Sequence, residues 1–440
     1  MAASVFESPL FAQLFPTGDV GRLFTDSAEI RAMMLVEGAL AKVQGGQGII
    51  PELSAAAISR AAMEIQIDPG ALAEATGQNG VCVPAFVAAF RTEMSAPEHA
   101  QFLHWGTTSQ DIIDTGLMLR LRQALALFER DLRALLTRLG TLATAHADTV
   151  MAARTFGQHA TVTSFGAVVA GWGAPLLSCL QGLEGLRAQH LIVSLSGAAG
   201  TASALGENAD RTRAELADAL GLADPGRCWH TDRAPVLALL DWMVQLSQAL
   251  GKMGADLSDL AQTGINEVAF GGAGASSTLP QKQNPVGPNT LEALARITAA
   301  QRAMIPGVHR HQRDGAAWFG EWMVVPQVVL GCASALCIAD KTVAGLTPLP
   351  DQMRAALTGQ DLIHAEAISF ALAAHMTRPE AQTAVKAMCR EAMQTGASLG
   401  DLLARDYPDL DSAGLVDPDR QMGNAPATAR AFGAAVRHVS

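Results

Sequence analysis

One uninterrupted stretch of the chain constrains its fold more than any other feature. Residues 109–147 read SQDIIDTGLMLRLRQALALFERDLRALLTRLGTLATAHA and contain no proline, and apolar residues return at Leu117, Leu121, Leu125 and Phe128. This spacing predicts an α-helix of roughly ten turns with one apolar face. Such a long helix needs partners along its whole length, because its apolar face would otherwise meet water.

Further segments repeat this helical pattern, whereas alternating strand patterns are scarce. The single tyrosine and the low aromatic content also disfavour a core built on sheets. We therefore predict an all-α fold, a long-helix bundle with smaller helical domains at the N- and C-terminal ends. The other long helices are expected at 164–188, 234–260, 289–304 and 321–339, and the domains at 1–103, 104–348 and 349–440.

Composition excludes several classes of protein. The formal net charge of −11 argues against a nucleic-acid surface, so any anionic ligand must be bound by a local basic site. The six cysteines are scattered without a C-x-x-C pair, which indicates neither a zinc cluster nor a disulfide framework and favours a reducing compartment. The N-terminal residues MAASVFESPLFAQLF do not have the pattern of a signal peptide, so we expect a cytoplasmic location.

One uncharged segment tests the expectation that no membrane is involved. Residues 155–183 contain no Asp, Glu, Lys or Arg, and this uncharged segment is long enough to span a bilayer. Polar residues such as His159, Gln158 and Gln181 interrupt this segment, and helices that are apolar all round also occur in the cores of large bundles. We therefore predict a helix buried in a soluble protein.

Three polar clusters stand out from this apolar background. In HWGTTSQD, residues 104–111, Thr107, Thr108 and Ser109 offer hydroxyls and backbone N–H groups at a helix start, where an anion is favoured. A plain helix cap explains the same residues equally well. In RTFGQHATVTSFG, residues 154–166, His159 is either a functional group or a hydrogen-bonded core residue.

The third cluster is the loop GASSTLPQKQNPV, residues 274–286, between two helical segments. Its serines supply hydroxyls, Pro280 and Pro285 restrict the backbone, and Lys282 supplies a positive charge. No metal site is indicated, because the eleven histidines form no H-E-x-x-H or comparable ligand set. The glycine-rich GGAGA, residues 271–275, lacks the spacing of a dinucleotide or phosphate loop, and so no organic cofactor is implied.

Taken in order, these three clusters resemble the three shared regions of the fumarase/aspartase superfamily. The third resembles its signature loop, although Ala275 stands where glycine is usual and Leu279 where methionine is usual. The resemblance covers about residues 5–435. It implies a small polycarboxylate substrate, no cofactor, and a homotetramer whose active sites are assembled from three chains.

Phe156 bears on which reaction the resemblance implies. Members of the superfamily that expel an amine generally carry a histidine here, in an R-T-H sequence, as the acid for the leaving group. Phenylalanine cannot donate a proton, which a departing amine needs, whereas a departing carboxylate, with a pKa of about 4, does not. Phe156 therefore favours the lactone-forming members. The chain also resembles those members in four further segments, which are SGAAGTASALG (196–206), WHTDR (229–233), AAWFGEW (316–322) and VDPDRQMGNAP (416–426).

Two alternatives stay open at the level of sequence. One is a lyase that eliminates an amine from adenylosuccinate, argininosuccinate or another substituted succinate, in which His159 replaces the missing acid. His159 would lie near the same face as Phe156 if that turn were helical. The other alternative is a structural homologue that has lost catalysis.

The resemblance also implies roles for single residues. Ser276 would shuttle the carbon-bound proton, with Ser277 as second choice. Lys282 and Asn284 would hold substrate carboxylates, and His159, oriented by Glu267, would position a carboxylate or assist proton transfer. Further substrate contacts are expected at His104, Thr107, Thr108, Ser109, Gln158, His230 and Arg313. His309 and His311 could be part of a basic site or simply of a solvated basic turn.

Overall fold

The computed structural model describes residues 4–271, 274–275, 279 and 282–439. Its contacts divide the chain into two compact units, and each unit collects three separate chain segments. Unit 1 comprises Met1–Asp131, Cys179–Gln248 and Ala293–Cys337, and unit 2 comprises Leu132–Ser178, Ala249–Glu292 and Ile338–Ser440. The boundaries fall inside five long helices, so each of these helices contributes residues to both units. The three consecutive sequence domains stay a prediction.

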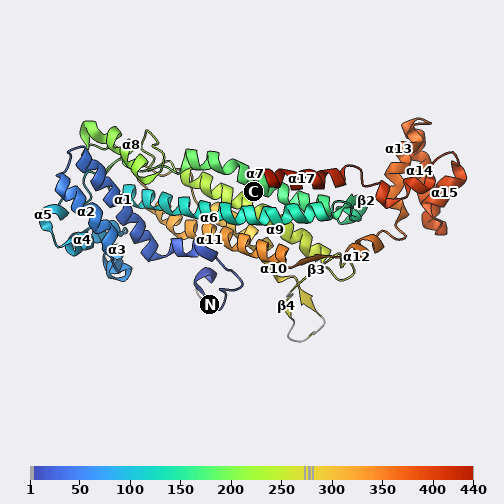
Figure 1. The fold of residues 1–440 in the computed structure, drawn as a ribbon, viewed down its shortest axis with the longest axis horizontal. Helices are drawn as coiled ribbons and strands as arrows, with labels where there is room; N and C mark the ends of the chain where they lie inside the picture. The colour runs from blue at the N-terminus through green and yellow to red at the C-terminus, as the bar shows by residue number, and fades with distance from the viewer. Residues whose placement is uncertain (1–3, 272–273, 276–278, 280–281, 440) are drawn as a thin grey trace. The chain divides into compact units, whose positions relative to one another are not determined.

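The five long helices are the ones that the periodicity predicts (Figure 1). In α6, Leu121, Leu125 and Phe128 are completely buried, which accounts for the apolar stripe seen in the sequence. The all-α fold class is confirmed. The helices are α6 (Ser109–Ala145), α7 (Phe165–His190), α9 (Ala234–Leu260), α10 (Val286–Arg302) and α11 (Gly315–Ala344).

The other helices of unit 1 are α1, which has 21 residues, and several shorter ones. α1 packs so closely on α2 that a Cβ atom at Gly38 would come within 2.8 Å of the Ala62 Cβ. Only glycine permits that approach. Figure 1 draws α1 to α5 in blue and α8, which comes later in the chain, in green. They are η1 (Val5–Glu7), η2 (Gly18–Phe24), α1 (Asp26–Gly46), α2 (Glu52–Glu64), η3 (Pro69–Leu72), α3 (Ala73–Asn79), α4 (Val83–Met94), α5 (Pro97–Ala100), η4 (Gly206–Asn208) and α8 (Ala209–Leu220).

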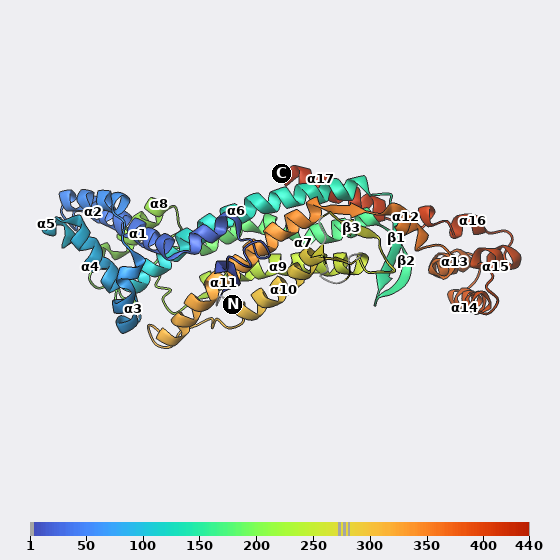
Figure 2. The same cartoon turned by 90° about the horizontal axis from the view of Figure 1, so that it is seen from below.

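Unit 2 ends in a group of short helices with a core of their own. Ile368, Leu372, Leu399 and Leu403 are buried in that core, and Figure 2 shows α13, α14 and α15 side by side, as Figure 1 does. The C-terminal elements are α12 (Pro350–Ala355), η5 (Asp361–His364), α13 (Ala365–Ala373), α14 (Arg378–Thr395), α15 (Leu399–Asp406), α16 (Ser412–Leu415) and η6 (Pro418–Arg420). They are followed by α17 (Ala425–Val439), which packs on α6 and α7 instead, since Cβ atoms at Gly140 and Gly173 would meet Val436 and Phe432.

Unit 2 also contains short strands that the helical reading of the sequence missed. They pair antiparallel in two-stranded sheets as β1 with β2, β3 with β6 and β4 with β5. The first pair is a hairpin whose buried Val150, Ala152 and Val162 pack with Leu357 and Ile363. The strands are β1 (Val150–Thr155), β2 (Gln158–Ser164), β3 (Val268–Phe270), β4 (Gly274–Ala275), β5 (Gln283–Asn284) and β6 (Leu346–Pro348).

Two described helices, α7 and α11, are long and apolar enough to cross a membrane by length and composition alone. Within their most apolar windows, 56% of α7 and 72% of α11 is buried inside the protein. Core helices of large soluble bundles have the same composition. The burial of α11 in particular favours the expectation of a soluble protein.

Candidate active site

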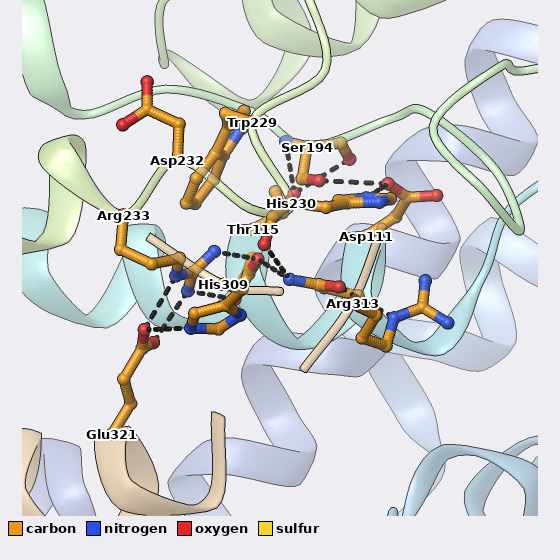
Figure 3. Close-up of polar contacts among 12 residues, drawn as sticks. Asp111, Thr115, Ser194, Trp229, His230, Asp232, Arg233, His309, Arg313 and Glu321 are labelled. Carbon is orange, nitrogen blue, oxygen red and sulfur yellow. Dashed lines mark hydrogen bonds and ion pairs between the residues drawn. The ribbon is translucent and has the colours of Figure 1, made fainter. Parts of the chain in front are cut away.

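A buried carboxylate near the start of α6 collects hydrogen bonds from several parts of unit 1 (Figure 3). Asp111 is completely buried, and the described residues place six donors around its two oxygens. We call Asp111 and these donors the Asp111 cluster. The donors are Thr107 Oγ1 (3.3 Å), Thr108 N (3.1 Å), Ser194 Oγ (2.9 Å), Ser196 N (2.9 Å), Gly197 N (2.9 Å) and His230 Nε2 (2.7 Å).

His230 and Asp111 form an ion pair inside the protein. Burial opposes a charge on the imidazole, but the interactions with Asp111 and Cys228 together outweigh burial and raise the pKa of His230 to about 9. Burial likewise opposes a charge on Asp111, and the bond from His230 with the N–H groups of Ser196 and Gly197 nevertheless lowers the pKa of that carboxyl. At neutral pH the pair is therefore an imidazolium and a carboxylate.

The Asp111 carboxylate changes the interpretation of the helix start. Thr107 and Thr108 were expected to offer donors to an external anion, but both donate to Asp111, the third residue after Thr108. An acidic residue at this position that bonds back to the first residue is one half of a capping box. An internal anion thus already stabilises the N-terminus of α6, and Ser109, half-buried, is its first residue.

A second buried network lies beside the Asp111 cluster. Arg233 is completely buried and forms two bidentate ion pairs, with Asp114 at 2.8 and 2.9 Å and with Glu321 at 2.8 and 2.8 Å. The Nε2 atom of His309 lies 3.2 Å from Glu321, and the guanidinium stacks 4.9 Å from the centre of the Trp229 ring. We call these five residues the Arg233 cluster. The solvated-turn alternative is wrong for His309, which is buried, whereas His311 is exposed.

Gln110 joins the two clusters. Its amide nitrogen donates to Asp114 at 3.2 Å and to the backbone carbonyl of His230 at 2.9 Å. Its amide oxygen accepts from Arg313 Nε at 2.8 Å, and Arg313 Nη2 also donates to the carbonyl of Ala198 at 3.2 Å. Gln110 therefore links the predicted Arg313 to the backbone of the predicted His230. Arg313 is half-buried, and part of its guanidinium group is open to solvent.

His104 is held by a different carboxylate. Its Nδ1 lies 2.6 Å from Oε1 of Glu37, which is buried, and its backbone N–H donates to Oε2 at 3.2 Å. Its backbone has a φ of +65°, a strained conformation for a residue with a Cβ atom. The bond to Glu37 leaves Nε2 of His104, which is half-buried, as the nitrogen available to a ligand.

The predicted residues in unit 2 lie on two pairs of strands. The segment from 154 to 166 is a hairpin and not a helical turn, because Arg154 pairs with His159 across the strands and Phe156 and Gly157 make the connection. Both connecting residues have positive φ, +51° and +72°, as type I′ turns require. The turn is not helical, so the condition under which His159 would lie near the same face as Phe156 is not met. Phe156 is fully exposed, and Gln158 is exposed.

Glu267, which was expected to orient His159, is instead paired with Arg154. Its two oxygens accept from Arg154 Nη1 at 2.7 Å and Nη2 at 2.8 Å, and Glu267 is completely buried. This bidentate geometry satisfies the carboxylate, and the described residues show no bond from it to His159. His159 itself is half-buried on β2.

The signature loop begins and ends on β4 and β5. Gly274 pairs with Asn284 and Ala275 with Gln283, which holds the two ends of the segment together. Lys282 is exposed and Asn284 half-buried. Ser276 and Ser277, the predicted proton shuttles, lie outside the described residues.

Comparisons with known proteins agree along nearly the whole chain. A family model described as "Lyase" matches residues 20–299, and a 3-carboxy-cis,cis-muconate cycloisomerase of Pseudomonas aeruginosa is 36% identical over 95% of this chain and 94% of its own length. The chain belongs to the fumarase/aspartase superfamily. The predicted family is thus confirmed, and with it the expectation of an enzyme.

Two other members of the superfamily bear on its finer assignment. A crystal structure of the 3-carboxy-cis,cis-muconate lactonizing enzyme from Pseudomonas putida superposes with a TM-score of 0.89 at 31% identity, covering 98% of this chain and 99% of that one. A nitrosuccinate lyase of Streptomyces davaonensis is 33% identical over 96% of this chain and 94% of its own length. The superfamily therefore holds similar enzymes with different substrates.

Several residues that organise this superfamily member were not predicted. Asp111 stands within a motif singled out in the sequence, and its place three residues after Thr108 is a recognisable capping signal. Arg233 and Glu321 lie in the segments 229–233 and 316–322, which the resemblance singled out without a role for either residue. Glu37 and Asp114 occur inside ordinary helical patterns, and their burial in the folded chain distinguishes them.

Proposed function

We propose that this chain is a 3-carboxy-cis,cis-muconate cycloisomerase of the lactone-forming type, acting in the breakdown of protocatechuate. The similarity to the Pseudomonas aeruginosa cycloisomerase over 95% of the chain carries this proposal. Phe156 supports it at the level of one residue, because no leaving-group acid stands at that position. In this reaction one carboxylate adds across a conjugated double bond, and read backwards that carboxylate departs without needing a proton.

The proposed reaction forms a γ-lactone, 4-carboxymuconolactone. As the ring closes, a proton is delivered to the carbon next to a second carboxylate, and extra negative charge gathers on that carboxylate in the transition state. Preorganised donors aimed at this charge should give the largest catalytic effect. We assign the proton transfer to Ser276, and the carboxylate contacts to Lys282, Asn284, His104 and Arg313.

We also propose a homotetramer with active sites shared between chains. Phe156 is fully exposed at the end of a hairpin, and Gln158 beside it is exposed. A large apolar ring at the tip of an exposed turn has no packing partner in its own chain, although the turn itself would favour asparagine or aspartate there. Contact with another copy of the chain would explain it. Light scattering of the purified protein tests this, since the chain mass of 45.9 kDa separates a tetramer clearly from a monomer or dimer.

A second candidate activity is elimination from nitrosuccinate. The similarity to the Streptomyces davaonensis enzyme covers 96% of this chain, and the argument from Phe156 does not exclude that activity. Nitrite, like a carboxylate, is a weakly basic leaving group and needs no acid. By contrast, the absence of a histidine at residue 156 still counts against adenylosuccinate and argininosuccinate.

The decisive experiment compares these substrates directly. Purified protein is mixed with 3-carboxy-cis,cis-muconate, and loss of the conjugated diene is followed by ultraviolet absorbance while the lactone is identified by NMR. Parallel reactions contain nitrosuccinate, adenylosuccinate and argininosuccinate and are assayed for fumarate or a substituted fumarate. We expect diene loss with lactone formation. Elimination from any of the succinates without diene loss would overturn the proposal.

A further inference from the structure

One buried amide connects the Arg233 cluster to the half-buried Arg313. Gln110 is completely buried, and its Nε2 donates both of its hydrogens, to Asp114 at 3.2 Å and to the carbonyl of His230 at 2.9 Å. Its Oε1 is left to accept, and it receives the Nε–H of Arg313 at 2.8 Å. Both N–H bonds and the oxygen of this amide are therefore engaged by groups of the same chain.

The neighbours of Gln110 permit only one orientation of its amide. Asp114 accepts two bonds from Arg233, at 2.8 and 2.9 Å, and a carboxylate paired with arginine in this way is an acceptor only. The backbone carbonyl of His230 is likewise an acceptor only. Turning the amide by half a turn would place its oxygen against both acceptors and its NH₂ group against the N–H of Arg313. The Arg233 cluster thus determines that Gln110 presents an acceptor to Arg313.

Gln110 in turn determines which nitrogens of Arg313 are left for a ligand. A guanidinium has five N–H donors in one plane. Gln110 engages the Nε donor, and the carbonyl of Ala198 engages one donor of Nη2 at 3.2 Å. Figure 3 shows the terminal nitrogens of Arg313 pointing away from the Arg233 cluster, and no carboxylate among the described residues pairs with them. The remaining donors, on Nη1 and Nη2, are those that bind both oxygens of a carboxylate.

We propose that Gln110 is a positioning residue, which holds the guanidinium of Arg313 in the orientation that binds a substrate carboxylate. The proposal rests on the proposed function, in which Arg313 contacts a carboxylate of 3-carboxy-cis,cis-muconate. A free arginine side chain has many rotamers, and a ligand that must select one of them binds more weakly. Because Gln110 fixes the guanidinium in advance, the substrate does not have to order it.

The test measures how tightly the native full-length protein binds a tricarboxylate that cannot react. Propane-1,2,3-tricarboxylate has the carboxylates of the proposed substrate without its double bonds, and isothermal titration calorimetry gives its Kd. Gln110→Met removes the amide at nearly constant volume and should weaken binding about tenfold. Gln47→Met is the matched control, because the Gln47 amide accepts from Thr212 at 2.6 Å instead, and it should leave the Kd unchanged.

A double-mutant cycle separates positioning from a general loss of structure. Arg313→Gln should weaken binding of the tricarboxylate about ten- to hundredfold. If Gln110 acts through Arg313, adding Gln110→Met to Arg313→Gln should weaken it no further, whereas a merely structural role would make the two losses multiply. The proposal is overturned if the losses multiply, if Gln110→Met binds as tightly as the unchanged protein, or if the unchanged protein does not bind the tricarboxylate.

Arg313→Lys keeps the proposal testable if Gln110→Met does not fold. Lysine retains the positive charge, but its single nitrogen cannot bond to Gln110 and Ala198 and still offer two parallel donors to a carboxylate. Binding should weaken about tenfold, and a Kd equal to that of the unchanged protein would contradict a role for orientation.

Turnover of 3-carboxy-cis,cis-muconate is measured separately on the same proteins. If the cycle shows coupling but no diene is lost, the proposed function fails and the role of Gln110 stands. If the diene is lost but the two losses multiply, only the role of Gln110 fails.

Discussion

The Asp111 cluster in unit 1 and the hairpin end in unit 2 carry candidate site residues in opposite ways. The Asp111 carboxylate is completely buried and receives six hydrogen bonds from its own chain. Phe156 is fully exposed, and Gln158 and Lys282 are exposed. A buried residue such as Asp111 fixes the positions of the side chains and backbone around it. An exposed residue such as Lys282 is available to a ligand or to another chain. Substitutions in the two regions should therefore affect different measurements.

The largest effect is expected at the signature loop. Ser276→Ala should reduce turnover of 3-carboxy-cis,cis-muconate about 10²- to 10⁴-fold, the usual range for a lost proton-transfer group. Steady-state kinetics measures the loss, and an unchanged thermal midpoint and mass would show that folding and assembly are intact. Ser277→Ala is the matched control and should lose less. Near-normal turnover in Ser276→Ala would move the proton transfer to Ser277 or His159.

The Arg233 cluster should respond in stability. Arg233→Met leaves Asp114 and Glu321 buried without their partner, which should lower the free energy of unfolding by about 3–5 kcal/mol. Urea denaturation measures the change. Arg154→Met is the comparison in unit 2, where the arginine is paired with one buried carboxylate, Glu267, in place of two, so a smaller loss is expected. Equal losses would contradict the contrast between the regions.

A smaller loss is expected when Asp111 keeps its shape but loses its charge. Asp111→Asn should lower the free energy of unfolding by about 1–3 kcal/mol, because an amide cannot accept all the bonds that the carboxylate accepts. The pKa of His230, followed by NMR of the imidazole, should fall from about 9 toward or below its ordinary 6.5. Asp232→Asn, at a side chain that is 38% exposed, should change stability little. An unchanged His230 pKa in Asp111→Asn would contradict the ion pair.

The same ion pair predicts how stability depends on pH. The folded protein binds the His230 proton more tightly than the unfolded chain, so this stabilisation is complete below pH 6.5 and is lost as the pH rises through about 9. Cys228 acts in the opposite sense, since its pKa is lowered by folding. The decline should therefore be clearest in Cys228→Ser, with a slope of at most about 1.4 kcal/mol per pH unit in urea denaturation. His230→Gln combined with Cys228→Ser should be flat across this range.

The smallest effect on folding is expected at the exposed turn. Phe156→Ser should change the free energy of unfolding by less than about 0.5 kcal/mol, because the ring has no buried contact to lose. Urea denaturation at low protein concentration measures this. Light scattering of the same variant tests whether the ring supports assembly instead. A loss of several kcal/mol in the dilute chain would show that the turn stabilises its own unit.

The sequence predicted the long helices because their signal is local. Periodicity in 234–260 matches α9 residue for residue, and the apolar stripe of α6 is buried as expected. The hairpin at 150–164 was not predicted, because its turn places phenylalanine at a positive φ, where asparagine or aspartate is usual. Apolar and polar residues also alternate only weakly along its strands. Gly157 was the one available signal for a turn there.

The site was predictable only in part, for a related reason. The motif 104–111 and His230 were singled out, but the hydrogen bond between Asp111 and His230 joins residues 119 positions apart. Likewise, Glu267 bonds to Arg154, 113 positions away, and no local pattern could reveal that pairing. Residue types that suggest chemistry can be read from a sequence, whereas the partners that complete their hydrogen bonds require the folded chain.

The bonds around Asp111 also bear on folding. Four of its six donors are 83 to 119 residues away along the chain. Contacts between such distant residues close large loops, and the entropy lost in closing them slows folding. The six bonds of the Asp111 cluster therefore require chain segments that local helix formation alone does not bring together. A chain that held its long helices without these closures would not yet have the donors that keep the Asp111 carboxylate charged inside the protein.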